Sequence, residues 1–227
     1  MNVFAFLKSL DEILYEVVSW LLFYPLTLWR VIRHPLDMMK RAYTEVASAG
    51  ENRFDDALSP PLLLLLTILV SHAIELSMIG QSVLVREQSG LAGYIKDDTS
   101  LILLRMVAFS IFPLVFATRA VRARNAILNR HTLEPEFYAQ SYVNAPYALM
   151  VSIASTLLQV NDDTTKMIAV VLGGTSIVVF LAFETVWFRR EMNLSTWRAL
   201  GHVLRAYVEA ALALSLVAFL IGGDVGL

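Results

Sequence analysis

Apolar segments of about 20 residues recur along this chain, and they limit its possible folds more than any other feature. The clearest runs from Ser59 to Gln81 and reads SPPLLLLLTILVSHAIELSMIGQ. A helix that crosses the hydrocarbon core of a bilayer needs roughly 20 mostly apolar residues. Hydrophobic residues make up 57% of the chain and charged residues 17%, against about half and about a quarter in soluble domains. The sequence therefore predicts an all-α integral membrane protein.

Five segments meet this length requirement, which predicts a polytopic bundle of five transmembrane helices. Their approximate ranges are 60–79, 100–118, 142–160, 167–187 and 203–221. At the first of them, Ser59 is a suitable N-cap, and the two prolines that follow suit the first turn of a helix. The chain then divides into a helical segment before the first span, residues 1–58, and a five-span domain, residues 59–227.

Basic residues gather in alternate loops, which predicts the direction in which the chain crosses the membrane. Of the 18 lysines and arginines, fourteen precede span one or lie between spans two and three or spans four and five. Arg86, Lys96 and Lys166 lie on the other side, and Arg105 lies within a span. We therefore expect a cytoplasmic N-terminus and an outer C-terminus. The four tryptophans fall on the predicted cytoplasmic side, as an interfacial aromatic belt would.

The first 58 residues are not expected to cross the membrane. Apolar residues recur with helical spacing along 4–18, while Lys8, Asp11 and Glu16 occupy much of the opposite face. We interpret residues 3–43 as one or two amphipathic helices lying in the cytoplasmic interface. The alternative is that this segment packs on the protein's own spans, and the two interpretations are compatible.

An ionisable cluster is predicted inside the membrane. With a helix rise of about 1.5 Å per residue, Glu75 on span one and Arg105 on span two lie at the same depth. We expect them to pair, with His72 nearby on the same face of span one. Three interpretations remain open: an ion pair that fixes helix register, a proton or ion pathway, or a metal site that uses His72 and Glu75.

A second polar cluster is predicted toward the cytoplasm. Arg198, His202, Arg205 and Glu209 recur at spacings of three or four along the helix that leads into span five, and Glu184 lies near the inner end of span four. Arg205 is the expected local partner of Glu209. The other basic groups are expected to extend to the interface.

Several function classes find no support in the sequence. The chain has no cysteine, which excludes disulfides and thiolate chemistry. Its net charge of −2 gives no global basic field for nucleic acid. It carries no G-x-S-x-G, H-E-x-x-H or phosphate-binding glycine loop. We therefore expect a protein that is not an enzyme and that needs no cofactor.

Two local segments carry a family resemblance. FDDALSPPLLLL, Phe54 to Leu65, and FYAQSYVNAPYAL, Phe137 to Leu149, precede spans one and three. With the five-span layout they resemble the Yip family (Ypt-interacting proteins) and its bacterial relatives, over about residues 54–221. The resemblance implies a non-enzymatic membrane scaffold or membrane-shaping protein that associates with itself or with other membrane proteins. The short loops suit a member from the bacterial inner membrane.

Lipids and partner membrane proteins are thus the expected ligands. Arg119, Arg122 and Arg130 are expected to share a stripe that extends span two into the cytoplasm. The candidate contact surface comprises Arg30, Arg33, Lys40, Arg41, Arg119, Arg122, Arg130, Tyr138, Tyr142 and Pro146.

The rival hypothesis is a transporter or channel subunit with a polar pathway at His72, Glu75 and Arg105. A water-filled cavity reaching His72 and Glu75 would favour transport, and a dry, closed contact would favour the scaffold. An apolar groove at residues 137–149 would favour a docked partner.

Overall fold

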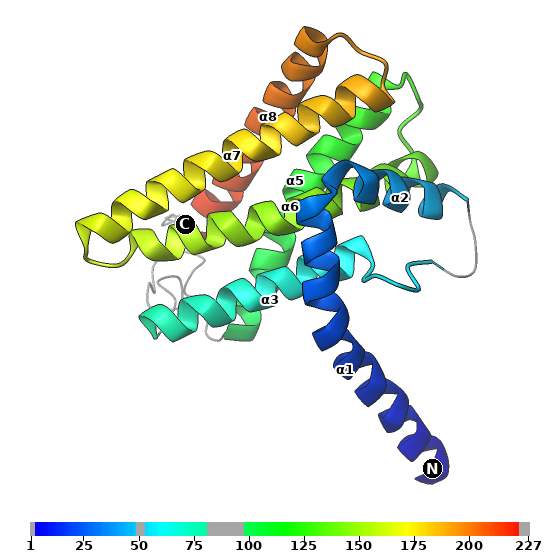
Figure 1. Cartoon of the computed structure of the whole chain (residues 1–227), viewed down its shortest axis with the longest axis vertical. Coiled ribbons are helices and arrows are strands. Elements are labelled where there is room, and N and C mark those ends of the chain that lie inside the picture. Colours follow the sequence, from blue (N-terminus) through cyan, green and yellow to red (C-terminus); the bar gives the residue numbers. More distant parts are fainter. Residues whose placement is uncertain (1–2, 49–52, 81–97, 223–227) are drawn as a thin grey trace, which may run out of the picture.

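A computed structural model describes residues 3–48, 53–80 and 98–222 of the chain, and every regular element in these ranges is an α-helix. The prediction of an all-α fold is confirmed. The helices, in chain order, are α1 (Val3–Arg33), α2 (Pro35–Ala47), α3 (Pro60–Ile79), α5 (Asp98–Ala123), α6 (Arg130–Leu158), α7 (Asp163–Glu191) and α8 (Thr196–Gly222) (Figure 1).

Four of the described helices are long and apolar enough to cross a membrane. These segments are Pro60–Ile79, Leu104–Ala123, Asp163–Glu191 and Thr196–Val217. They overlap the predicted spans one, two, four and five, and α3 has the predicted bounds of span one. Ser59 occupies the N-cap position of α3 as predicted, although its side chain makes no capping hydrogen bond. The third predicted span, residues 142–160, overlaps α6 and extends two residues past its end, and α6 is not among the four.

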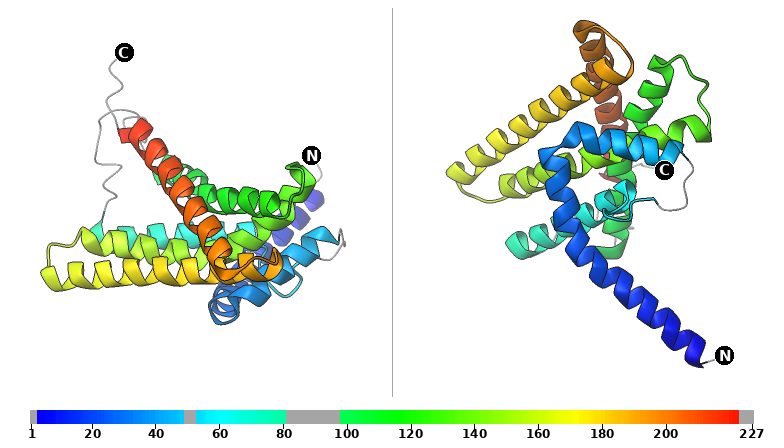
Figure 2. Two further views of the ribbon diagram at one scale, coloured as in Figure 1. Left: turned by 90° about the horizontal axis from the view of Figure 1, so that it is seen from above. Right: turned by 45° about the vertical axis from the view of Figure 1, so that its right-hand side comes forward.

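The helix α6 is the centre of the bundle, because it packs against α2, α3, α5 and α7 (Figure 2). It begins at Arg130, well before the predicted residue 142. A reciprocal cap starts it: Asn129 Oδ1 accepts from the Thr132 amide at 3.0 Å, and Thr132 Oγ1 accepts from the Asn129 amide at 3.1 Å. The helix continues through both Pro135 and Pro146.

The low apolarity of α6 follows from this central position. Three polar side chains, Gln140, Ser141 and Asn144, are no more than 2% exposed. Ser141 Oγ and Asn144 Nδ2 donate to carbonyls one turn earlier in α6, while the Gln140 amide bonds to α7. Since these groups face other helices, α6 does not need the apolar surface of a helix surrounded by lipid.

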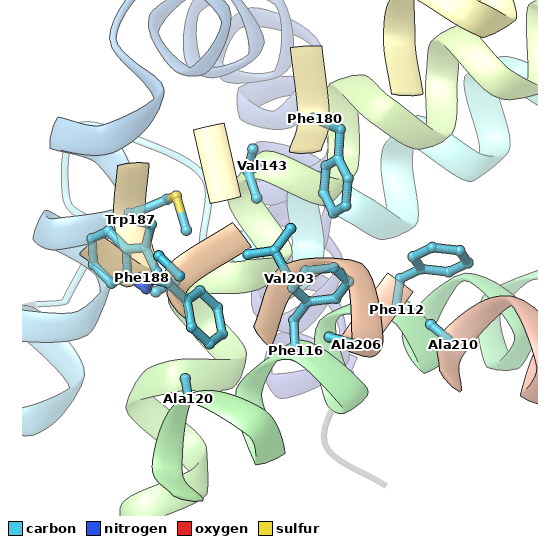
Figure 3. Packing of buried hydrophobic residues seen from close by; sticks show 13 residues of the cluster. Phe112, Phe116, Ala120, Val143, Phe180, Trp187, Phe188, Val203, Ala206 and Ala210 are labelled. Atoms are coloured by element: carbon cyan, nitrogen blue, oxygen red, sulfur yellow. The ribbon is translucent and has the colours of Figure 1, made fainter. Parts of the chain in front are cut away.

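Two hydrophobic clusters hold the helices together. In the first, aromatic rings of α5 and α7 meet small residues of α8 (Figure 3). The rings of Phe116 and Phe180 are 5.3 Å apart and edge-to-face, and Ala206 and Ala210 are fully buried beside them. In the second cluster, Leu63 and Ile68 of α3 pack with α1, α2 and α6.

The N-terminal segment packs on this second cluster. Tyr24 Oη donates to Thr67 Oγ1 at 3.3 Å, and Thr27 Oγ1 accepts from the Leu58 amide at 3.0 Å. Pro25 lies inside α1, and the helix continues through this residue to Arg33. The first half of α1 projects away from the other helices (Figure 1).

An ion pair and a hydrogen bond join predicted cytoplasmic segments at one end of the bundle. Lys40 Nζ of α2 lies 3.7 Å from a Glu191 carboxylate oxygen, and Arg124 Nη1 donates to the Glu191 carbonyl at 3.1 Å. The predicted outer residues Arg86 and Lys96 lie outside the described residues. Trp187 is 2% exposed, so its assignment to an interfacial aromatic belt was wrong.

Candidate functional site

The predicted contact between Glu75 of α3 and Arg105 of α5 is present. Arg105 Nη2 donates to Glu75 Oε2 at 2.5 Å, and Arg105 Nη1 lies 3.3 Å from His72 Nδ1. His72 Nδ1 also lies 3.5 Å from Glu75 Oε2. We call His72, Glu75 and Arg105 the outer polar site, after the side of the membrane on which the sequence predicts them.

The carboxylate of this site is almost fully removed from solvent, while its arginine is not. The side chains of Glu75 and His72 are each 5% exposed, and that of Arg105 is 18% exposed. The charge-assisted hydrogen bond joins α3 to α5 and thereby favours one register between them.

A polar cavity borders the outer polar site. It has a volume of about 200 Å³ and is lined by Glu75 and Arg105 together with Ser71, Phe109, Val151, Ser152, Ser155, Thr156 and Gln159. This space between α3, α5 and α6 is large enough for several waters and offers them hydrogen-bond partners. His72 does not line it. The Glu75 and Arg105 side chains therefore contact each other directly and also border a space that water can occupy.

A metal ion finds few ligands at this site. Across residues 3–48, 53–80 and 98–222, no group of three or more His, Cys, Asp or Glu side chains is arranged to hold a metal ion. The hypothesis that His72 and Glu75 bind a metal thus gains no third protein ligand from the described chain.

The second predicted cluster is only partly brought together. Arg205 Nε donates to Glu209 Oε1 at 3.1 Å, which confirms this local pair. Glu209 also accepts from Arg119 Nη2 of α5. Sequence reasoning missed this contact because it assigned Arg119 to an exposed stripe, whereas Arg119 is 9% exposed.

Glu184 does not belong to this cluster, so that assignment was wrong. Its side chain is fully buried and faces α6, where Gln140 Nε2 donates to Glu184 Oε2 at 3.1 Å. Counting along α7 placed Glu184 near the inner end of the span, but it did not give the direction of the side chain around the helix axis.

A second buried carboxylate near Glu184 was not predicted. Glu136 is 1% exposed and accepts from Arg124 Nε at 2.6 Å. The Arg124 guanidinium also lies over the ring of Tyr43, 5.0 Å from its centroid. We call Arg124, Glu136, Gln140 and Glu184 the inner carboxylate cluster.

Burial governs the ionisation of Glu136. It raises the pKa of this carboxyl above its usual range, and the charge and hydrogen bond of Arg124 oppose the rise. The sequence held a signal for this cluster, because Glu136, Gln140 and Asn144 recur at four-residue spacing. Such a polar stripe on a helix that lies within a membrane bundle indicates a face turned toward other helices.

The predicted contact surface is partly engaged within the chain. Arg30 Nη1 donates to Asp56 Oδ2 at 3.1 Å, and Arg41 bonds to both Glu45 and Asp56. The hydrogen bond from Arg41 is the main reason that the pKa of Asp56 is lowered. Lys40 pairs with Glu191.

The predicted stripe was wrong at Arg130, and the predicted surface position of Tyr142 was wrong. The helix α5 ends at Ala123 and Asn125 has a φ of 56°, so Arg130 begins α6 and does not extend the stripe of Arg119 and Arg122. Tyr142 is fully buried, and its hydroxyl donates to the Leu58 carbonyl at 2.7 Å.

The remaining aromatic and proline positions lie where a partner or lipid can reach them. Tyr138 is half-buried and stacks on Phe54 with ring centroids 6.1 Å apart. Pro146 lines an apolar groove of about 230 Å³ between α1, α2, α6 and α7, together with Val31, Tyr147 and Phe180. The segment 137–149 therefore does contribute to an apolar groove.

Comparisons with protein-family models, curated proteins and solved structures find no match to this chain. The resemblance to the Yip family stays a prediction from the sequence.

Proposed function

We propose that this chain is a non-enzymatic membrane-organising protein that acts on the cytoplasmic leaflet through α1. One observation carries the proposal: the second half of α1 is apolar on two opposite faces. Trp20 and Phe23 face the bundle, whereas Leu21 and Leu22 on the other side are 75% and 60% exposed.

The uncovered face requires an apolar environment. It continues through Leu26, Trp29 and Ile32, which are 44%, 60% and 45% exposed. Fully burying one such side chain contributes about 1.5–3 kcal/mol, so contact with lipid acyl chains would stabilise this orientation by several times that amount. Arg33 is exposed at the end of the same helix, where it would attract an anionic headgroup with about 1 kcal/mol.

The transmembrane arrangement that places α1 at this leaflet has five crossings. In this arrangement α6 is the span between those of α5 and α7, and its buried polar stripe explains why its hydropathy falls below that of the other four. The alternation of basic segments then supports a cytoplasmic N-terminus and an outer C-terminus. The short loops and the Yip-like segments support a bacterial inner membrane.

A single-cysteine experiment tests the proposal, since the natural chain has no cysteine. Leu22→Cys, labelled with a polarity-sensitive fluorophore and reconstituted in vesicles with brominated acyl chains, is expected to show a blue-shifted and quenched emission. Glu16→Cys, at an exposed charged position of the same helix, serves as the matched control and is expected to report water. Water-like emission from Leu22→Cys would contradict the proposal.

A second experiment tests the organising activity itself. Replacing Leu21 and Leu22 with glutamate is expected to abolish protein-dependent changes in vesicle diameter while the helical content is retained. Ile127→Glu, at an 81% exposed position outside α1, controls for added charge. If wild-type protein leaves vesicle diameter unchanged, or if both variants act alike, membrane organisation by α1 is excluded.

The polar cavity favours a second candidate function, a pathway for a proton or a small polar solute. Glu75 would carry the proton or hold the solute, with Ser152 and Thr156 providing further contacts. Proteoliposomes that contain a pH-sensitive dye test this function. Proton flux that is present with the wild-type protein, lost with Glu75→Gln and kept with Glu16→Gln supports a pathway. Wild-type flux no faster than that of protein-free vesicles excludes a proton pathway.

A further inference from the structure

Basic side chains from two helices converge on a single cavity at the predicted cytoplasmic end of the bundle. The cavity has a volume of about 270 Å³ and is lined by Arg119 of α5 and by Arg198, Gly201, His202 and Arg205 of α8. The spacing of the α8 residues puts them on one face of that helix. The cavity shares no lining residue with the outer polar site or with α1.

The cavity carries more positive charge than its neighbours compensate. Glu209 binds two of the three guanidinium groups, those of Arg119 and Arg205. Arg198 forms no ion pair with any residue of the described ranges. Three cations that share one carboxylate repel one another, and a bound anion would relieve this repulsion.

The neighbouring contacts hold some of these groups in place. The Arg119 side chain is 10% exposed and is tied to Glu209 across the α5–α8 contact. The ring of His202 stacks on that of Phe188, with centroids 6.3 Å apart and an interplanar angle of 23°. Holding these groups in advance lowers the entropic cost of binding a ligand.

Glycine at position 201 keeps the cavity open. A Cβ atom added there would meet no atom within 4 Å, so the space in front of the backbone is empty. A long side chain at this position would fill the cavity without a clash at its first atom.

We propose that this cavity binds a phosphate group. The planar guanidinium fork matches the oxygens of a phosphate and can donate two parallel hydrogen bonds to it. The group belongs either to the headgroup of an anionic phospholipid or to a soluble phosphate, because both present the same oxygens. The inference does not rest on the role proposed for α1.

The test uses the full chain in lipid nanodiscs and compares three variants. Arg198→Gln removes the arginine that forms no ion pair within the described ranges, and Gly201→Leu fills the cavity while leaving every charge in place. Arg190→Gln, at an exposed position near the end of α7, is the matched charge control. The helical content and melting temperature of each variant without added anion establish that it is folded.

Two probes distinguish the sources of phosphate. In the first arm, native mass spectrometry counts phosphatidylglycerol retained from mixed phosphatidylglycerol and phosphatidylcholine membranes. In the second, inorganic phosphate is titrated into protein in phosphatidylcholine nanodiscs, and the rise in melting temperature gives its affinity. Loss of one charged hydrogen-bond donor is expected to weaken binding about ten-fold.

The outcomes separate the two sources and the alternative. Weaker binding by both Arg198→Gln and Gly201→Leu, with binding by Arg190→Gln unchanged, supports the proposal. If phosphatidylglycerol retention falls in this way, the ligand is a lipid headgroup. If the affinity for inorganic phosphate falls in this way, the ligand is a soluble phosphate. Binding equal to wild type in both cavity variants overturns the proposal. Weaker binding by Arg198→Gln alone, or an equal weakening in Arg190→Gln, would mean that general surface charge causes the effect. Either result also overturns the proposal.

Discussion

The outer polar site and the inner carboxylate cluster use the same chemistry in different surroundings. Each pairs a buried glutamate with an arginine, at 2.5 Å for Glu75 and Arg105 and at 2.6 Å for Glu136 and Arg124. The outer pair borders a cavity with hydroxyl groups. Around the inner pair, Tyr43 lies against Arg124, and the neighbouring carboxyl of Glu184 has no exposed surface. The cavity can thus bring water to the Glu75 carboxylate, whereas at the inner site the exposed member is Arg124, at 25%, and the Glu136 side chain is only 1% exposed.

The largest effect is expected from Arg124→Met. Removing one member of a buried ion pair leaves the other charge without compensation, which costs about 3–5 kcal/mol of unfolding free energy. Arg122→Met, at an exposed neighbouring position, should change it by less than about 0.5 kcal/mol. Denaturant unfolding in micelles measures both.

A double variant sharpens the interpretation of that loss. Combining Arg124→Met with Glu136→Gln should recover part of the lost stability, because the remaining side chain is then neutral. Equal unfolding free energies for Arg124→Met and Arg122→Met would mean that the inner cluster does not depend on its arginine.

A smaller effect is expected from Arg105→Met at the outer site. Because the cavity lets water reach the Glu75 carboxylate, the loss should be about 1–3 kcal/mol. The exchange of charges in Glu75→Arg with Arg105→Glu should restore stability relative to either single variant. Thermal unfolding of wild type, Glu75→Arg, Arg105→Glu and the double variant checks this exchange. A loss at Arg105 larger than that at Arg124 would reverse the comparison.

The smallest effect is the pH dependence that Glu136 contributes. Its pKa in the folded chain is raised by burial, so folding takes up a proton between the ordinary carboxyl pKa and the raised one. The unfolding free energy from this group therefore increases as pH falls through that window, by less than about 1.4 kcal/mol per pH unit.

Glu136→Gln should remove this contribution. Asp56, whose pKa is lowered by Arg41, works in the opposite sense, because its stabilising contact is lost as pH falls through its folded pKa. The unfolding free energies of wild type, Glu136→Gln and Asp56→Asn, measured from neutral pH to about pH 3, should show slopes that depart from wild type in opposite directions. Slopes that depart in the same direction would rule out the burial of an ionised Glu136.

The two regions also differ in how far the sequence predicted them. The pair of Glu75 and Arg105 was found by counting depth along two apolar helices, because the helix rise fixes the level of each residue. Depth alone cannot choose a side of the helix, and this is why Glu184 was grouped with residues of α8 although it faces Gln140 of α6.

The start of α6 shows a second limit of the sequence. A search for apolar segments finds the part of a helix with few polar groups, so the polar residues before Tyr142 were interpreted as a loop. The cap formed by Asn129 and Thr132 is a local signal that could have located Arg130 as the first residue. The pair between Arg119 and Glu209 needed knowledge that α5 and α8 are neighbours, which no local pattern contains.

The central position of α6 bears on how the chain is assembled. A ribosome synthesises α6 before α7, so Gln140 emerges before its partner Glu184 exists. Phe180 and Trp187, which cover the neighbouring core, also emerge later. The polar stripe of the nascent α6 therefore stays uncovered until α7 has been synthesised. A chaperone or the insertion machinery would have to shield it during this interval.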